Sequence, residues 1–470
     1  MNTNIRRLAT IMVLAVVALV LQLSWWQVIA ADELTAKMPF NAPRALAAEQ
    51  SVQRGAILDR KGRPLAWSEQ TSDGVKRVYA EPSLVHALGY YSYRFGSTNI
   101  EQAFDSYLQA ESGQTILDRL RRDVFYEPVK GADVVTTLDL DLQRAADKAL
   151  GDWPGAIVAI NPRTGEILAL ASHPYFDPNQ LDSLWEQLIN DPAKPLVNRA
   201  AGGLYVPGST FKTLTLAAAL DAGVVTPETT FENKGDFTVE GFHIVYTNPP
   251  GHPVFNLSDA FAYSVNAAFA DIGLRLGADK LQEAAARFGL GQAIPLKGIP
   301  TAVSEIETSP GFLNDKPALA STAFGQGELS ITPLQMALVS AAVANGGNVP
   351  RPYVVSEVRR ADGQVVYRDG PQTWQRAMSE ETARVIDDMM VYSVDVGYAK
   401  TAQIAGVKVG GKTGTAETSS TEESHAWFIG YAPADNPTIA VAVIREHAGP
   451  GSTGATPEAR QVIQAWLDHQ

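Results

Sequence analysis

The centre of this sequence is Val206-Pro207-Gly208-Ser209-Thr210-Phe211-Lys212, which runs straight into Thr213-Leu214-Thr215-Leu216-Ala217-Ala218-Ala219-Leu220. The Ala- and Leu-rich half is typical of a buried helix that ends at Gly223, and Pro207-Gly208 marks the turn into it. Ser209 therefore lies at a helix start, where unpaired backbone N–H groups and the helix dipole favour developing negative charge. Lys212 follows three residues later, so its side chain shares a helix face with Ser209.

This pair suggests an activated serine. A serine hydroxyl is a poor nucleophile until a neighbouring base takes its proton. Lys212 can be that base if burial or a nearby cation lowers its pKa. The plainer interpretation is an N-cap serine followed by an exposed lysine, and the tetrapeptide alone does not separate the two. Two later segments favour the catalytic interpretation.

The second signal is Ala262-Tyr263-Ser264-Val265-Asn266, between a helical pattern that starts near Ser258-Asp259 and another that ends at Gly277. A polar pair between apolar segments is also common in a plain helix-capping loop. Beside a Ser/Lys nucleophile, Ser264 offers a second hydroxyl that can carry a proton. Asn266 offers an amide that can hold a substrate peptide.

The third signal is Lys412-Thr413-Gly414-Thr415-Ala416, at the end of a predicted strand that begins at Val407. Glycine inside a strand weakens it and often marks the close approach of another backbone or of a ligand. A lysine and two threonines there would bind a carboxylate through charge-assisted and hydroxyl hydrogen bonds. The three signals, in this order, are hard to assign to chance.

Strand patterns lie at both ends of the C-terminal segment. Residues 155–160 and 165–170 form a predicted hairpin, and three more strands are predicted at 407–415, 426–431 and 438–444. Helical patterns fill about 210–345, and the chain closes with a helix that begins at Thr456-Pro457. This order predicts an α/β fold of the α+β type, with one antiparallel sheet and an inserted all-helical lobe. A cleft between sheet and lobe is a natural place for a site.

Composition excludes several function classes. The formal net charge is -13 and no basic tract is present, which argues against nucleic-acid binding. Cysteine is absent, so the protein has no disulfides, no thiol nucleophile and no thiolate metal site. The seven His residues show no metal-ligand spacing, and we expect neither a metal nor a cofactor.

The N-terminal residues predict a membrane anchor. Arg6-Arg7 precede an apolar run from Leu8 to Ala30, longer than the about 20 residues that span a bilayer. The arginines favour a cytoplasmic N-terminus, and Trp25-Trp26 suit the far interface, which would leave the rest of the chain outside. A signal peptide cleaved after Val28-Ile29-Ala30 is the alternative, although the apolar run is longer than usual for one.

Residues 31–150 read as a small, irregular domain. The segment from Arg54 to Ala66 predicts a hairpin with a charged turn closed by Gly62. Tyr90 to Gly96 is rich in aromatic residues, which either pack inside the protein or contact a partner. Leu138 to Leu150 reads as a helix, with Asp139 or Asp141 at its start and Gly151 at its end.

Together, Ser209-x-x-Lys212, Ser264-x-Asn266 and Lys412-Thr413-Gly414 resemble the motifs of the penicillin-recognising serine transpeptidases. The Arg54-Gly55-x-Ile57-x-Asp59-Arg60-x-Gly62 segment resembles the motif of the non-catalytic region of class B penicillin-binding proteins. Further likeness lies in Gly325-Gln326-Gly327 and in the segment from His425 to Pro433. The small N-terminal region is most similar to that of the short-pedestal, PbpA-type members.

The resemblance implies a five-stranded antiparallel sheet flanked by helices, and a role for each motif residue. Ser209 would attack the bond between the terminal D-alanines of a peptidoglycan stem peptide, and Lys212 would take its proton. Ser264, with Lys412, would pass a proton to the departing D-alanine, and Asn266 would hold the stem-peptide amide. The Lys412-Thr413-Gly414-Thr415 strand would bind the donor, with Thr413 and Thr415 on its carboxylate. The backbone N–H groups of Ser209 and Thr415 would form the oxyanion hole.

The resemblance also implies a division of the chain into an anchor (1–30), a pedestal (31–150) and a transpeptidase domain (151–470). The pedestal is too small for a glycosyltransferase, so a membrane glycosyltransferase is the expected partner, and β-lactams are expected to bind covalently. A D,D-carboxypeptidase, a β-lactamase-like hydrolase and an idle cell-wall scaffold remain alternatives. Glu307, before Leu313-Asn314, has the wrong spacing for the deacylating glutamate of class A β-lactamases.

Overall fold

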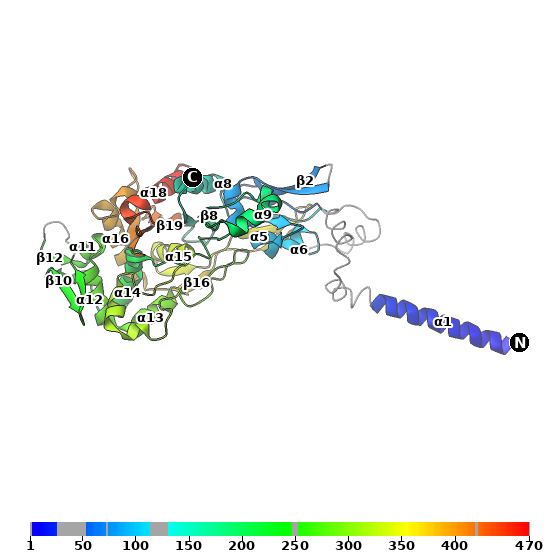
Figure 1. Cartoon of the computed structure of the whole chain (residues 1–470), viewed down its shortest axis with the longest axis horizontal. Helices are drawn as coiled ribbons and strands as arrows, with labels where there is room; N and C mark the ends of the chain where they lie inside the picture. Colours follow the sequence, from blue (N-terminus) through cyan, green and yellow to red (C-terminus); the bar gives the residue numbers. More distant parts are fainter. Residues whose placement is uncertain are drawn as a thin grey trace.

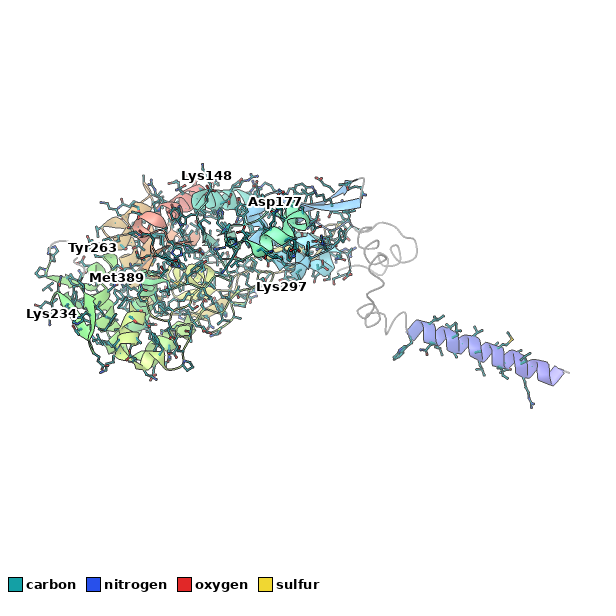
Figure 2. The ribbon with its side chains drawn as sticks, viewed as in Figure 1. Lys148, Asp177, Lys234, Tyr263, Lys297 and Met389 are labelled. Carbon is teal, nitrogen blue, oxygen red and sulfur yellow. The ribbon has the colours of Figure 1, made fainter. Side chains whose placement is uncertain are left out.

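The computed structural model describes residues 2–25, 53–71, 74–112, 130–246, 252–418 and 422–469 (Figure 1). Near the N-terminus, helix α1 runs over Asn2–Ser24, and its Arg6–Leu23 segment has a mean hydropathy of 1.9. The helix is long and apolar enough to cross a membrane, and its apolar side chains are exposed (Figure 2). The far interface expected at Trp26 and the alternative cleavage site at Val28–Ala30 lie outside the described residues.

The C-terminal body is built on one five-stranded antiparallel sheet, as expected. Its order is β17-β18-β19-β7-β8, with β17 at one edge. Strands β7 (Gly155–Ile160) and β8 (Ile167–His173) form the expected hairpin, and β18 (His425–Ala432) and β19 (Ile439–Arg445) form another. Strand β17 (Gly410–Ala416) starts three residues later than expected. In the sheet, β19 pairs with β7, so strands far apart in the sequence lie side by side.

Helices cover both faces of this sheet because alternate residues of each strand point in opposite directions. Ile157 and Val443 pack in one hydrophobic cluster with α8 (Leu140–Leu150) and α18 (Thr456–Asp468). Val158 and Ala442 belong to the other cluster, which includes α15 (Pro333–Ala344). Both outer helices have the expected limits: Asp139 caps α8, Gly151 ends it with a positive φ, and α18 starts at Thr456.

The inserted lobe is mainly helical. Its helices are α10 (Lys212–Asp221), α11 (Leu257–Ala262), α12 (Asn266–Leu276), α13 (Ala278–Arg287) and α14 (Lys316–Ala323), and α16 (Glu380–Asp395) joins it to β17. The expectation of an all-helical lobe was too narrow, because two small sheets also lie in it. They pair β9 (Thr230–Glu232) with β12 (Val254–Asn256), and β10 (Asp236–Val239) with β11 (Phe242–Val245). Glu240 and Gly241 both have positive φ, which is the geometry of a tight hairpin turn.

The pedestal is organised around a six-stranded sheet, in the order β15-β14-β6-β1-β2-β3. Strands β1 (Ile57–Leu58) and β2 (Pro64–Thr71) form the expected hairpin, followed by β3 (Gly74–Tyr79) and β6 (Asp133–Thr136). Two of its strands, β14 (Val355–Arg359) and β15 (Val365–Arg368), come from much later in the chain. Helix α8, placed before residue 150, packs on the other sheet. Contacts therefore cross the proposed boundary at residue 150 in both directions.

A buried charge network holds the pedestal together behind the Arg54-Gly55 motif. The Arg54 guanidinium pairs with Glu101 at 2.9 Å and with Asp105 at 2.6 Å, and Arg77 pairs with Glu101 at 2.7 Å. Gly55 is required because a Cβ there would lie 1.9 Å from the carbonyl oxygen of Ala132. The motif thus has a structural role within the pedestal.

Shorter elements complete the body. Phe95 stacks on Trp185 of α9 with ring centroids 4.2 Å apart, which supports the packed interpretation of the aromatic segment Tyr90–Gly96. The other helices and strands are α4 (Val85–Leu88), β4 (Tyr91–Ser92), β5 (Gly96–Ser97), α5 (Asn99–Ala103), α6 (Asp105–Leu108), α9 (Leu181–Asn190), β13 (Asn348–Pro350), β16 (Thr373–Arg376) and α17 (Gly451–Gly454).

Candidate active site

Ser209 stands on a tight turn at the start of α10. The turn is a 3-10 helix, Gly208–Phe211, which leads directly into α10. Gly208 has φ +56, and a Cβ there would lie 2.5 Å from the carbonyl oxygen of Thr415, so the turn can press against β17 only with glycine. The Thr210 hydroxyl donates to the Pro207 carbonyl at 2.7 Å and fixes the turn. The turn therefore holds Ser209 beside the edge strand β17.

Lys212 is fully buried, which rules out the exposed-lysine interpretation. Its Nζ lies 2.9 Å from Ser209 Oγ, 2.9 Å from Ser264 Oγ, 2.8 Å from the Ser264 carbonyl oxygen and 2.6 Å from Asn266 Oδ1. Burial, and then the nearby charge of Lys412, hold the pKa of Lys212 well below its ordinary value. A neutral amine can accept a proton, and Ser209 Oγ lies within hydrogen-bond distance of this one.

Ser264 and Asn266 lie between α11 and α12, as expected. Ser264 has φ +58, a strained conformation for a serine, and such strain is concentrated at functional sites. Asn266 is the first residue of α12, so its side chain projects from a helix start toward Lys212. The two polar side chains therefore face Ser209 and Lys212 from the helical lobe.

Lys412 approaches the same hydroxyl from the sheet. Its Nζ lies 3.0 Å from Ser264 Oγ and 3.0 Å from the Thr413 carbonyl oxygen. The side chain is fully buried, and burial lowers the pKa of Lys412 to about 7. A lysine with that pKa exchanges its proton near neutral pH, which suits a proton donor to a leaving group.

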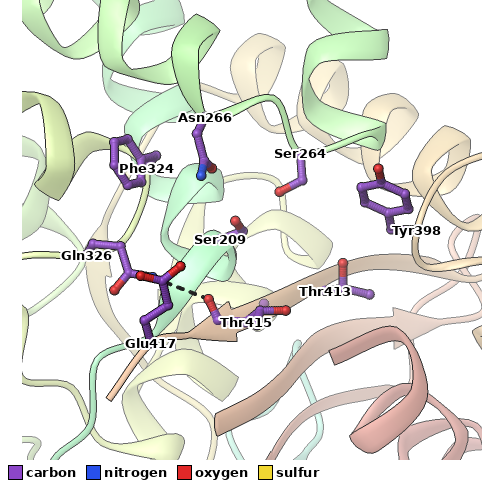
Figure 3. Close-up of a pocket in the computed structure, with 10 residues that line it drawn as sticks. Ser209, Ser264, Asn266, Phe324, Gln326, Tyr398, Thr413, Thr415 and Glu417 are labelled. Carbon is purple, nitrogen blue, oxygen red and sulfur yellow. Dashed lines mark hydrogen bonds between the residues drawn. The ribbon is translucent and has the colours of Figure 1, made fainter. Parts of the chain in front are cut away.

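A cavity of about 200 Å³ opens over these groups (Figure 3). The predicted residues that line it are Ser209, Ser264, Asn266, Thr413, Gly414 and Thr415, and Lys212 and Lys412 are buried beneath Ser264. The structure therefore brings together all three sequence signals, from the turn before α10, the loop before α12 and the edge strand β17.

Four cavity residues were not singled out as site residues from the sequence: Phe324, Gln326, Tyr398 and Glu417. Gln326 carried a usable signal, because it lies between two glycines. A Cβ on Gly325 would lie 1.8 Å from the Gly208 carbonyl oxygen, so this segment packs against the nucleophile turn. Tyr398 carries no such signal, because tertiary packing alone brings it to the cavity. Glu417 lies next to the third sequence signal, two residues beyond Thr415.

Gly414 in β17 marks the close approach of another backbone segment, the turn that carries Ser209, as expected. A Cβ on Gly414 would lie 2.8 Å from the Pro207 carbonyl oxygen and 2.9 Å from Thr210 Cγ2. Gln326 Nε2 donates to the Thr415 carbonyl at 3.4 Å across the cavity, and Thr415 Oγ1 accepts from the Gly451 N–H at 3.3 Å. The nucleophile turn and the outer edge of β17 together form the floor of the cavity.

Two family models match this chain. The penicillin binding protein transpeptidase domain matches residues 155–464, and the penicillin binding protein A dimerisation domain matches residues 54–134. Among curated relatives, the peptidoglycan D,D-transpeptidase PbpA of Mycolicibacterium smegmatis is 38% identical over 99% of both chains.

Solved structures agree with this match. Penicillin-binding protein A from M. tuberculosis, as a penicillin G acyl-enzyme complex, superimposes with a TM-score of 0.81 at 35% identity, over 88% of this chain and 100% of that one. Pseudomonas aeruginosa PBP2 gives a TM-score of 0.76 at 30% identity, over 88% of this chain and 95% of that one. Because the transpeptidase-domain model matches most of this chain, the chain belongs to the penicillin-binding protein transpeptidase family.

Proposed function

We propose that this chain is a serine D,D-transpeptidase that cross-links peptidoglycan stem peptides through an acyl-enzyme on Ser209 and releases D-alanine. The observation that carries the proposal is the 2.9 Å contact between Ser209 Oγ and the Nζ of Lys212, a fully buried lysine of lowered pKa. The names of the relatives agree, since they are peptidoglycan D,D-transpeptidases and one of the solved structures is a penicillin G acyl-enzyme.

In the acylation step, Ser209 Oγ attacks the carbonyl carbon between the two terminal D-alanines, and Lys212 Nζ takes the hydroxyl proton. The backbone N–H groups of Ser209 and Thr415 stabilise the oxyanion. The C–N bond then breaks, and the departing nitrogen receives a proton through the Ser264 hydroxyl, which lies 3.0 Å from Lys412 Nζ. The products are an ester on Ser209 and free D-alanine.

The donor binds along β17. This strand is at the edge of its sheet, so its outer backbone groups can pair with an extended peptide. The Thr413 and Thr415 hydroxyls bind the terminal carboxylate, and Asn266 holds the stem-peptide amide. Gly414 lets the Ser209 turn lie close to the strand that binds the donor. In the second step an amine of a neighbouring stem attacks the ester, forms the cross-linking amide and returns the proton to Ser209. A β-lactam imitates the donor and remains on Ser209.

We propose that α1 is an uncleaved single-pass anchor, with the N-terminus cytoplasmic and the pedestal (31–150) and transpeptidase domain (151–470) outside. Support comes from the apolar length of α1 and from Arg6-Arg7 at its start. The chain has no cysteine, so a Glu422→Cys variant carries a single thiol at an exposed site. A membrane-impermeant maleimide should label it in cells with the outer surface accessible, and absence of labelling until lysis would contradict this topology.

The partner we propose is a membrane glycosyltransferase that supplies the glycan strands. Support comes from the pedestal (31–150), which is smaller than a glycosyltransferase domain. Co-purification with such a membrane protein after cross-linking in cells would support it, and cross-linking to soluble proteins alone would contradict it.

The alternatives fit the site less well. Glu307, the nearest sequence candidate for the glutamate motif of class A β-lactamases, accepts hydrogen bonds from Gln282 and from the Leu313 N–H and does not line the cavity. An idle scaffold does not need two buried lysines on one serine hydroxyl. Mixing a stem pentapeptide with an acceptor amine tests the proposal directly: a cross-linked product and free D-alanine are expected, and hydrolysis without cross-linking would favour the carboxypeptidase.

A further inference from the structure

Glu417 is the single charged side chain that lines the cavity, among the residues described. It follows β17 directly, two residues beyond Thr415, and its side chain is exposed (Figure 3). Within the described part of the chain, its carboxylate makes no ion pair and no hydrogen bond. The two catalytic lysines are fully buried behind Ser264 and do not neutralise it by direct contact.

The order of residues along β17 determines which residue of a bound donor peptide would lie beside Glu417. Thr413 and Thr415 bind the terminal carboxylate, and the Ser209 turn presses against Thr415, since a Cβ on Gly208 would meet the Thr415 carbonyl at 2.5 Å. The scissile carbonyl is therefore level with Thr415. An extended donor that continues along the strand runs on toward Glu417, and each further residue advances it by about 3.3 Å.

Cavity chemistry beyond Thr415 favours a long side chain that ends in a cation. Phe324 and Gln326 lie on the same end of the cavity as Glu417 (Figure 3), and Gln326 Nε2 is directed at the Thr415 carbonyl. A carboxylate without a partner at the mouth of a substrate site attracts a positive group and repels a negative one. A donor side chain that ends in a carboxylate would be disfavoured near Glu417.

We propose that Glu417 is a specificity residue that binds a side-chain ammonium of the donor, on the residue that precedes the two terminal D-alanines. The inference rests on the proposed transpeptidase function and deepens it by naming a donor class, a stem peptide whose third residue carries a free amine. The contact is an ion pair near the surface. It gives a modest preference that salt weakens.

The test uses the full-length chain in detergent and two pentapeptide donors that end in L-Lys-D-Ala-D-Ala, one with a free lysine ε-amine and one with that amine acetylated. Release of D-alanine gives kcat/KM for each. For the wild type we expect a preference of roughly two- to five-fold for the free amine at low ionic strength. The preference should shrink in about 0.5 M salt.

Glu417→Gln should bring this ratio close to one. The matched control is Glu422→Gln, which removes the same charge from the same β17–β18 connection but outside the cavity, and which should keep the wild-type ratio. A wild-type ratio of one, an unchanged ratio in Glu417→Gln, or an equal loss in Glu422→Gln would overturn the inference.

Two further measurements distinguish a role of Glu417 in donor binding from a role in acceptor binding and from failure of the proposed function. With the acetylated donor held constant and the free-amine peptide varied as acceptor, a raised acceptor KM in Glu417→Gln, with an unchanged donor ratio, would show that the carboxylate serves the acceptor and that the donor assignment is wrong. If the folded wild type releases D-alanine from neither donor, the proposed function fails. Equal use of both donors leaves that function standing and refutes the role of Glu417.

Discussion

Lys212 and Lys412 share one oxygen: Ser264 Oγ lies 2.9 Å from the Nζ of Lys212 and 3.0 Å from the Nζ of Lys412. Two buried ammonium groups so close to one atom repel each other, so the site favours a single proton on the pair. With Lys412 protonated and Lys212 neutral, one lysine can accept the Ser209 proton while the other supplies a proton through Ser264. In the proposed reaction, Lys212 would be the base and Lys412 the acid.

Removing the base should nearly abolish acylation. Lys212→Met keeps the length of the buried side chain but cannot accept a proton, and general-base catalysis contributes about 10²- to 10⁴-fold. We expect the second-order rate of acylation by penicillin G to fall by that factor. A rate within about tenfold of the wild type, in protein with unchanged circular dichroism, would show that Lys212 is not the base.

The pH profile of acylation should be bell-shaped. The acid limb reflects protonation of Lys212, whose pKa is lowered by burial and by Lys412, and the alkaline limb reflects loss of the Lys412 proton near pH 7. Lys412→Arg keeps a positive charge to much higher pH, since a guanidinium does not deprotonate in this range. The alkaline limb should therefore move up by more than one pH unit in this variant, even if its maximal rate is lower. An alkaline limb that stays in place would exclude Lys412 as its origin.

The close approach of the nucleophile turn to β17 predicts a sharp effect of one methyl group. Gly208→Ala would place Cβ 2.5 Å from the Thr415 carbonyl oxygen, so the Ser209 turn must move away from the strand. A displacement of about 1 Å can cost about 100-fold in rate, and we expect a loss of that order in acylation. Gly235→Ala is the control: it also has a positive φ but open space around the new Cβ, so it should lose about 1 kcal/mol of stability and little activity. Equal activity of the two variants would contradict the packing argument.

Much of this site was accessible from sequence because its parts are local. Pro207-Gly208 marks a helix start, Gly277 a helix end, and each motif lies within a few residues, so the turn, the loop and the strand could be placed separately. The pairing of β14 with β6 was not accessible, because it joins segments more than 200 residues apart and neither segment carries a signal for the other. Tyr398 was missed for the same reason, since only tertiary packing brings it to the cavity. Glu417 was missed although it lies two residues beyond Thr415, because a single acidic residue after a strand has no pattern of its own.

The buried network of the pedestal predicts an acid-sensitive stability. Burial raises the pKa of Glu101, but Arg77 and Arg54 outweigh it, so the net pKa is lowered. Its contribution to stability is therefore present above the unfolded-state pKa and lost as pH falls through the folded-state pKa. Glu101→Gln should destabilise the chain by about 3–5 kcal/mol at neutral pH, because two buried arginines lose their shared partner. Thermal unfolding from pH 7 to pH 3 measures both effects.

If the melting temperature of Glu101→Gln matches that of the wild type at pH 7, the network is not stabilising. The variant should also approach the wild type in stability as the pH falls, since acid protonates the wild-type carboxyl. A difference in melting temperature that grows with acidification would reverse the predicted sign.

Covalent capture of a β-lactam tests the central claim most directly. The full-length chain in detergent is incubated with penicillin G, and the intact protein and its Ser209→Ala variant are weighed by mass spectrometry. A stable adduct of one penicillin mass on the wild type, absent from the variant, is the result we predict for a nucleophilic Ser209 activated by Lys212. An adduct that persists in Ser209→Ala, or a folded wild type that forms no adduct, would contradict it.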